Sequence, residues 1–228
     1  SALNAPEHDQ GLPGNWWKRV RHDLRSAIAP MRMAVQLLRG GRMEAAEREE
    51  ALAVIDRQLE QLLAAVEDVG ELLHAQGGTL ALSSAPQDLN LLPDIVCGRG
   101  ALVRELAARQ LKLRCETCKE ELAVSHDPVR LSALLEFLLM RMAAHTPAGG
   151  ELLLEVDPKE GGSLRLSGAD PAFARDAELL YLQGIDAGSG DPGLRALLMR
   201  QLLRAGAMEL RGDGEGAVRL RFPPAATA

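Results

Sequence analysis

Apolar residues in the first third of the chain recur at alternating steps of three and four, the spacing of a coiled-coil seam. Two stretches carry this repeat, separated by Gly40-Gly41. The first is Leu24, Ile28, Met31, Val35 and Leu38; the second is Leu52, Ile55, Leu59, Leu62, Val66, Val69 and Leu73. The pattern predicts two helices, over residues 15–38 and 42–75, joined as an antiparallel hairpin. One hairpin offers too little apolar partner surface, so we expect a homodimer in which two copies form a four-helix bundle.

The rest of the chain mixes strand and helix patterns. Turn formers over residues 76–90 suggest a linker, and the elements expected after it are helices at 91–110, 128–144, 172–182 and 193–204 and strands at 111–114, 122–125, 152–156, 163–166, 208–211 and 217–222. Asp127-Pro128 is a strong helix start. Helices on one face of a mixed sheet make an α+β fold. We therefore expect a disordered lead-in over residues 1–14, a hairpin over 15–76 and an α/β sandwich over 88–223.

Composition narrows the function classes. The chain has 228 residues, 46% hydrophobic and only 3% aromatic, with a net charge of −6. The acidic balance argues against a general nucleic-acid binder. Neither an apolar run of membrane-spanning length nor a signal-peptide pattern is seen, so we expect a cytoplasmic protein with no membrane contact by this fragment.

The three cysteines are Cys97, Cys115 and Cys118. An odd number without secretory context favours reduced thiols over a disulfide framework. Cys115 and Cys118 have the spacing of a metal knuckle or a redox pair, but a structural zinc needs four ligands and His126 adds one at most. The sequence therefore predicts a strand end here and no metal site.

The candidate chemistry lies on the first helix, at His22. His22 is about 160° around the helix from Leu24, so it should face water. Asp23 is its neighbour and Ser26 follows one turn later, which puts a carboxylate and a hydroxyl within possible reach of the imidazole. From spacing alone, an ordinary surface histidine remains an alternative. A basic collar surrounds it, consisting of Lys18, Arg19, Arg21 and Arg25. Such a collar suits a phosphoryl group or an acidic partner pocket.

The run His22-Asp23-Leu24-Arg25, followed by Pro30, resembles the H-box of sensor histidine kinases. The resemblance implies that His22 accepts a phosphoryl group and that Asp23 assists proton transfer. It departs from the family at Ser26, where threonine or asparagine is usual, and at Ala27, where many members have proline.

The run from Asp127 to the segment His145-Thr146-Pro147 resembles the ATP-binding domain of the same family. The family's helix before this segment carries two asparagines, one of which helps to hold magnesium, and here those positions are Phe137 and Arg141. Gly168 stands where the family has its adenine-binding aspartate, and Asp191 brings a negative charge into the glycine-rich loop 188–193. We therefore expect no cofactor or metal on this chain.

The retained histidine and the lost nucleotide ligands together predict a histidine phosphotransferase of a two-component phosphorelay. His22 would shuttle a phosphoryl group between the aspartates of response-regulator receiver domains, with magnesium supplied by the receiver. Two alternatives stay open: an ATP-dependent sensor histidine kinase core with a divergent nucleotide site, and a non-catalytic dimeric pseudokinase scaffold.

Overall fold

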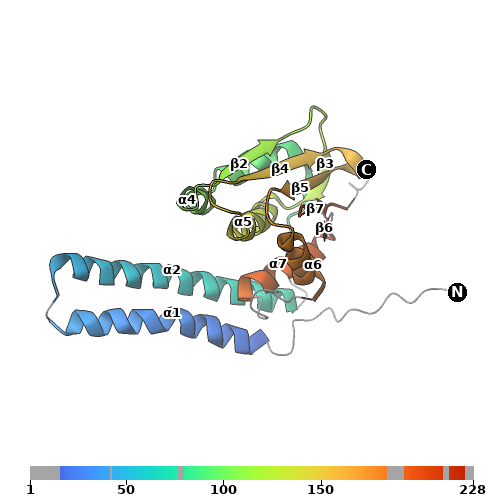
Figure 1. Cartoon of the computed structure of the whole chain (residues 1–228). Helices are drawn as coiled ribbons and strands as arrows, with labels where there is room; N and C mark the ends of the chain where they lie inside the picture. The colour runs from blue at the N-terminus through green and yellow to red at the C-terminus, as the bar shows by residue number, and fades with distance from the viewer. Residues whose placement is uncertain (1–15, 42, 77–79, 184–192, 213–215, 224–228) are drawn as a thin grey trace. The chain divides into compact units, whose positions relative to one another are not determined.

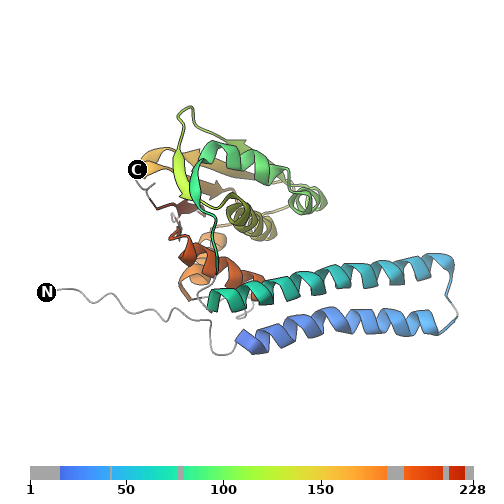
Figure 2. The ribbon, with the colours of Figure 1, turned by 180° about the vertical axis from the view of Figure 1, so that it is seen from behind.

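The computed structural model describes residues 16–41, 43–76, 80–183, 193–212 and 216–223. The chain divides into two compact units, residues 1–80 with 193–198 and residues 81–192 with 199–228. In the first, α1 (Trp16–Arg39) and α2 (Ala45–Gln76) lie side by side as a hairpin (Figures 1 and 2). The predicted hairpin is confirmed. The expected lead-in over residues 1–14 and the first residue of the predicted first helix lie outside the described residues.

Two apolar stripes run along the hairpin. The first holds its helices together: Val20, Ala27 and Ala34 are buried on α1 at a spacing of seven, and Ala51 and Leu72 are buried on α2. The second stripe is exposed within the chain. Its members are Ile28 and Val35 on α1 and Leu52, Leu59, Leu63, Val66 and Leu73 on α2. The buried residues are not members of the predicted seam, whose side chains are half-buried or exposed. Within the described part of the chain, the exposed side chains form an apolar face that nothing covers.

The second unit is an α/β domain with two sheets. Its elements are β1 (Ala85–Asp88), η1 (Leu89–Leu91), α3 (Leu92–Cys97), α4 (Gly100–Ala108), β2 (Lys112–Glu116), β3 (Ala123–His126), α5 (Pro128–Ala144), β4 (Glu151–Asp157), η2 (Lys159–Gly161), β5 (Ser163–Ser167), α6 (Ala172–Gln183), β6 (Glu209–Gly212) and β7 (Val218–Arg221). The helix α7 (Gly193–Ala205) begins in the first unit and ends in this one. Strands β1 and β3 pair with each other; the larger sheet has the order β2-β4-β5-β7-β6, in which only β2 and β4 are parallel.

Helix α5 is the centre of the second unit's core. Asp127 caps it, because its Oδ1 accepts the N–H groups of Val129 and Arg130 at 3.0 and 3.1 Å, and Pro128 occupies the first turn. The predicted helix start is confirmed. Buried side chains line this helix, among them Leu135, Leu138, Leu139 and Met142, and alternating residues of β4 and β5 are buried as well. Figure 1 shows α4 and α5 along one face of the larger sheet.

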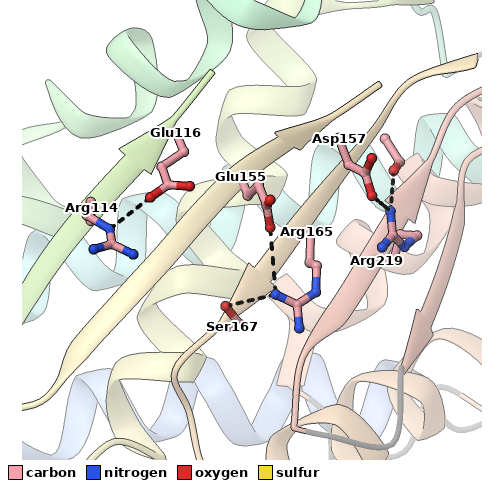
Figure 3. Close-up of polar contacts among 8 residues, drawn as sticks. Arg114, Glu116, Glu155, Asp157, Arg165, Ser167 and Arg219 are labelled. Atoms are coloured by element: carbon pink, nitrogen blue, oxygen red, sulfur yellow. Dashed lines mark hydrogen bonds and ion pairs between the residues drawn. The ribbon is translucent and has the colours of Figure 1, made fainter. Parts of the chain in front are cut away.

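Charged side chains alternate with the buried residues on these strands and pair on one face of the sheet (Figure 3). Arg165 lies 3.6 Å from Glu155, and Arg219 pairs with Asp157 and donates to the Ser163 hydroxyl at 2.9 Å. Burial opposes ionisation of Asp157, but the hydrogen bond from Arg219 keeps its pKa below the usual value. The described parts of these strands thus give an ion-paired, polar surface. Such a face of a sheet can stay in contact with water, so it needs no third layer of helices to cover it.

Two local expectations differ from the structure. The helix expected over 91–110 is interrupted, because Gly98 ends α3 and Arg99 is extended, with its guanidinium paired to Glu136 and donating to the Ser132 hydroxyl. The expected linker over 76–90 also contains β1, which pairs with β3 in antiparallel register.

Candidate functional site

His22 lies on the exposed side of α1, as its spacing predicts. Its side chain is 73% exposed, and Nδ1 lies 3.2 Å from Oδ1 of Asp23. This contact occupies Nδ1 and leaves Nε2 as the ring nitrogen open to an incoming phosphoryl group.

Asp23 is the more fixed member of the pair. Its side chain is 32% exposed, and its second oxygen, Oδ2, accepts the backbone N–H of Leu194 at 3.2 Å, within the same unit. A carboxylate held through both oxygens presents one orientation to the imidazole. The structure therefore brings together the predicted histidine and acid with the geometry of a base and its orienting group.

The other predicted catalytic group, Ser26, has a different contact. Its hydroxyl donates to the backbone oxygen of His22 at 2.9 Å, one helical turn back. Ser26 is exposed on the same side of α1 as His22, but this hydrogen bond is to the main chain and not to the ring. A catalytic role for Ser26 stays a prediction.

The basic collar is partly solvent-facing. Lys18, Arg21 and Arg25 are exposed, whereas Arg19 is half-buried and has contacts of its own. Lys18 and Arg25 are four residues before and three residues after His22, so they share its face. The three exposed cations are the ones available to an incoming anion.

Sequence reasoning missed an apolar extension of this face. Met33 and Leu37 are 66% and 55% exposed. They lie 11 and 15 residues after His22, which places them on the same face of α1 as His22 and Ser26. Their spacing from His22, combined with their absence from the seam, is the signal that would have identified them.

A buried carboxylate on α2 was also missed. Asp68 is 5% exposed and lies 3.1 Å from the Arg195 guanidinium, in the same unit. Burial raises the pKa of Asp68 to about 6, against the opposing effect of Arg195, and the nearby negative charges of Glu67 and Asp23 raise it further. The ion pair thus places one cation, Arg195, among several carboxylates of this unit.

Phe137 and Arg141, which stand where the resemblance places the family's two asparagines, contact each other. The Arg141 guanidinium lies 5.8 Å from the centre of the Phe137 ring, one turn earlier on α5. Such an arrangement is a cation–π contact. An aromatic ring and a guanidinium supply no oxygen ligand for a hard cation, so these two residues do not fit a magnesium site.

Gly168, which stands where the resemblance places the family's adenine-binding aspartate, has no space for a side chain. Gly168 follows β5 with φ +101°, and a Cβ there would lie 2.2 Å from the carbonyl oxygen of Glu151. The nearby Asp170 accepts the N–H of Ala172 at 2.8 Å and so supports the first turn of α6. The glycine-rich loop with Asp191 lies outside the described residues.

Within residues 16–41, 43–76, 80–183, 193–212 and 216–223, no group of three or more histidine, cysteine, aspartate or glutamate side chains is arranged to hold a metal ion. Over the same ranges, no helix has the length and apolar character that crossing a bilayer requires.

Residues 14–78 match the model of the His Kinase A (phospho-acceptor) domain, the segment that carries His22 and the hairpin. The chain resembles sensor histidine kinases. It is 27% identical over 166 residues to the signal transduction histidine-protein kinase BaeS of Escherichia coli K12. The alignment covers 73% of the chain and 34% of BaeS, so the chain spans about a third of the length of this curated relative.

Solved histidine kinases share the fold of this chain. Acinetobacter baumannii AdeS has a TM-score of 0.64 and 18% identity, with 88% of this chain and 96% of AdeS covered. ThkA, solved in complex with the response regulator protein TrrA, also has a TM-score of 0.64 and 18% identity, with 93% of this chain and 62% of ThkA covered. The predicted architecture, a helical hairpin followed by an α/β domain of the histidine-kinase type, is confirmed.

Proposed function

We propose that this chain is a histidine phosphotransferase, in which His22 accepts a phosphoryl group from the aspartate of one receiver domain and donates it to another. The observation that carries the proposal is the exposed imidazole with its Nδ1 held by Asp23, on the helix that matches the phospho-acceptor domain. The transfer needs a positioned nucleophile on this chain, while the receiver brings magnesium and the remaining catalytic groups.

The altered nucleotide positions support transfer between receivers over a reaction with ATP. Phe137 and Arg141 occupy the places of the family's asparagines and contact each other. The backbone at Gly168 leaves no space for the acid that the family uses to bind adenine. A domain with these features keeps the fold of a kinase domain, but it lacks the side chains that bind magnesium and adenine in the family.

We propose that receivers dock on the face of α1 that holds His22. The exposed cations Lys18, Arg21 and Arg25 complement the acidic pocket of a receiver, and the exposed Met33 and Leu37 give the contact an apolar centre. The fold neighbour ThkA was solved in complex with the response regulator protein TrrA, which supports a partner of this class.

We also propose that the chain is a homodimer. The exposed stripe of α2 places Leu52, Leu59, Val66 and Leu73 seven residues apart, with Leu63 beside them. Ile28 and Val35 extend this surface on α1. A contiguous apolar stripe on a long hairpin is removed from water when two hairpins form a four-helix bundle.

The test is phosphoryl transfer from receiver domains labelled on their aspartate. Wild-type chain incubated with each labelled receiver and Mg²⁺ should acquire a base-stable, acid-labile label from its cognate donor. His22→Ala should acquire none and should keep the same circular dichroism, because an exposed helical position tolerates alanine. His74→Ala, at an exposed histidine on α2, is the matched control and should be labelled normally.

Two other outcomes would favour the alternatives. Label from γ-labelled ATP on His22, together with a rise in melting temperature in millimolar Mg-ATP, would make the chain an ATP-dependent kinase. A chain that takes label from neither ATP nor any receiver, while still binding a receiver, would be a non-catalytic scaffold.

A further inference from the structure

We propose that Arg195 and Asp68 are positioning residues for phosphoryl transfer at His22, because their ion pair fixes the turn of α7 that holds Asp23. The inference rests on the phosphoacceptor function proposed for His22. Within the described residues, neither Arg195 nor Asp68 has a polar contact with the imidazole, so the two act through Asp23.

The first turn of α7 contacts both helices of the hairpin, within the first unit. Leu194 donates its backbone N–H to Oδ2 of Asp23 on α1 at 3.2 Å. The next residue, Arg195, places its Nε 3.1 Å from Oδ2 of Asp68 on α2. The other oxygen of Asp23, Oδ1, lies 3.2 Å from Nδ1 of His22. These contacts form one row that runs from Asp68 through the turn of α7 to the imidazole.

The N–H of Leu194 suits a carboxylate for two reasons. It lies in the first turn of α7, where a backbone N–H has no acceptor within the helix. The partial positive charge at a helix N-terminus also favours an anion there. Asp23 is thus held by a main-chain donor whose place depends on how the start of α7 is anchored.

Burial and charge together anchor this turn. Leu194, Leu197 and Leu198 are buried and share one side of α7 at helical steps of three and four. Asp68 is also buried, so removing Arg195 would leave a carboxylate inside the protein without its partner. Because an unpaired buried charge is strongly unfavourable, the turn and the carboxylate would have to rearrange.

The place of Asp23 matters because the imidazole gives up a proton when it takes a phosphoryl group. The His22 nitrogen attacks phosphorus, the phosphorus–oxygen bond of the receiver's aspartyl phosphate breaks, and the aspartate carboxylate leaves. The phosphorylated ring then loses a proton, which Asp23 can accept. A carboxylate displaced from the ring by about 1 Å loses much of this assistance.

Asp68 gives the arrangement a pH dependence of its own. Burial raises the pKa of Asp68 to about 6, against the opposing charge of Arg195, and the negative charges of Glu67, Asp23 and Glu71 raise it further. Asp68 is therefore ionised at pH 7.5 and largely protonated at pH 5, where its attraction for Arg195 is lost. The labelling rate of the wild type divided by that of Asp68→Asn should be largest at pH 7.5 and approach unity at pH 5. Titration of the phosphoacceptor ring occurs in both proteins and cancels in this ratio.

The experiment measures initial rates of His22 phosphorylation in the full chain with two donors. One donor is a phosphorylated cognate receiver. The other is phosphoramidate, a small molecule that needs no docking surface and releases ammonia when His22 takes its phosphoryl group. With both donors at pH 7.5, Asp68→Asn and Arg195→Met should react about tenfold more slowly than the wild type. Arg195→Lys keeps the charge and should lose less than Arg195→Met.

The matched control is Glu67→Gln, which removes the same charge at an exposed position next to Asp68 and should react like the wild type. A second comparison separates positioning from a general loss of stability. In an Asp23→Ala background, Asp68→Asn should have no further effect, because the carboxylate through which it acts is gone. Circular dichroism checks the fold of each variant. If Arg195→Met fails to fold, Asp68→Asn in the two backgrounds and the pH ratio decide the matter.

Four results would overturn the proposal: wild-type rates in both Asp68→Asn and Arg195→Met, a loss confined to the receiver as donor, the same loss in the Asp23→Ala background, or a rate ratio that is unchanged between pH 5 and pH 7.5. Labelling of the wild type by phosphoramidate but by no receiver would instead overturn the proposed function. The phosphoramidate rates of the same variants would then still decide whether Arg195 and Asp68 position Asp23.

Discussion

The backbone conformation at Gly168 explains why this position holds no acid, and it lets us predict how much stability any side chain there would cost. Gly168 has φ +101°, where a residue with a Cβ is strained by about 1–2 kcal/mol. Its Cβ would also lie 2.2 Å from the Glu151 carbonyl oxygen, so β4 or the turn after β5 must move. Such overpacking costs about 1–3 kcal/mol. We therefore expect Gly168→Ala to destabilise the second unit by about 3 kcal/mol.

Gly149 supplies the matched control. It has φ +81°, and nothing lies within 4 Å of its ideal Cβ position. Gly149→Ala should therefore cost only the conformational strain, about 1–2 kcal/mol. Because 1 kcal/mol shifts the melting temperature of a domain of this size by about 2–4 °C, circular dichroism or calorimetry will separate the two variants.

The same position tests the proposed function. Gly168→Asp introduces the aspartate that histidine kinases have at this position. Its steric cost is at least as large as that of Gly168→Ala. We expect a lower melting temperature and no additional stabilisation by millimolar Mg-ATP. Equal stability of Gly168→Ala and Gly149→Ala would refute the steric argument, and tighter ATP binding by Gly168→Asp would refute the conclusion that the nucleotide site is closed by the backbone.

Three further predictions concern other residues. Leu59→Glu, at a position 44% exposed in the single chain, should give a monomeric mass by light scattering with helicity retained, whereas Glu60→Lys beside it should leave the dimer intact. Met33→Lys should slow labelling by a receiver at least tenfold, while Arg32→Lys should not, as measured by initial rates. Burial lowers the pKa of His126 below 6.5, so stability should fall as the pH drops below about 6.5, and His126→Phe should remove that part of the pH profile in urea titrations.

Local patterns predicted most of the elements correctly because each depends on neighbours in sequence. Asp127 starts α5 by accepting the N–H groups of residues only two and three positions later. The hairpin follows from the apolar repeat of alternating three- and four-residue steps, which has the period of a helix. The face of His22 could be placed for the same reason. These features can therefore be predicted without knowing which residues pack against them.

The differences arose where distant residues decide the local structure. The extended backbone at Arg99 accompanies its contacts with α5, 33 and 37 residues away, which no helical pattern over 91–110 reveals. Strand β1 exists because β3 pairs with it. At the candidate site, the Ser26 hydroxyl had a main-chain acceptor in reach, and the second contact of Asp23 comes from Leu194, 171 residues away.

The placement of the aromatic pair on α1 gives the protein an intrinsic optical probe. Trp16 and Trp17 are the only tryptophans in the chain, their rings lie 5.5 Å apart, and Trp17 is 56% exposed. Both precede His22 by less than two helical turns. Emission excited at the red edge of the protein absorption band therefore comes from this end of α1 alone. A receiver that covers it should shift the emission to shorter wavelength, so docking can be followed in real time with unlabelled protein.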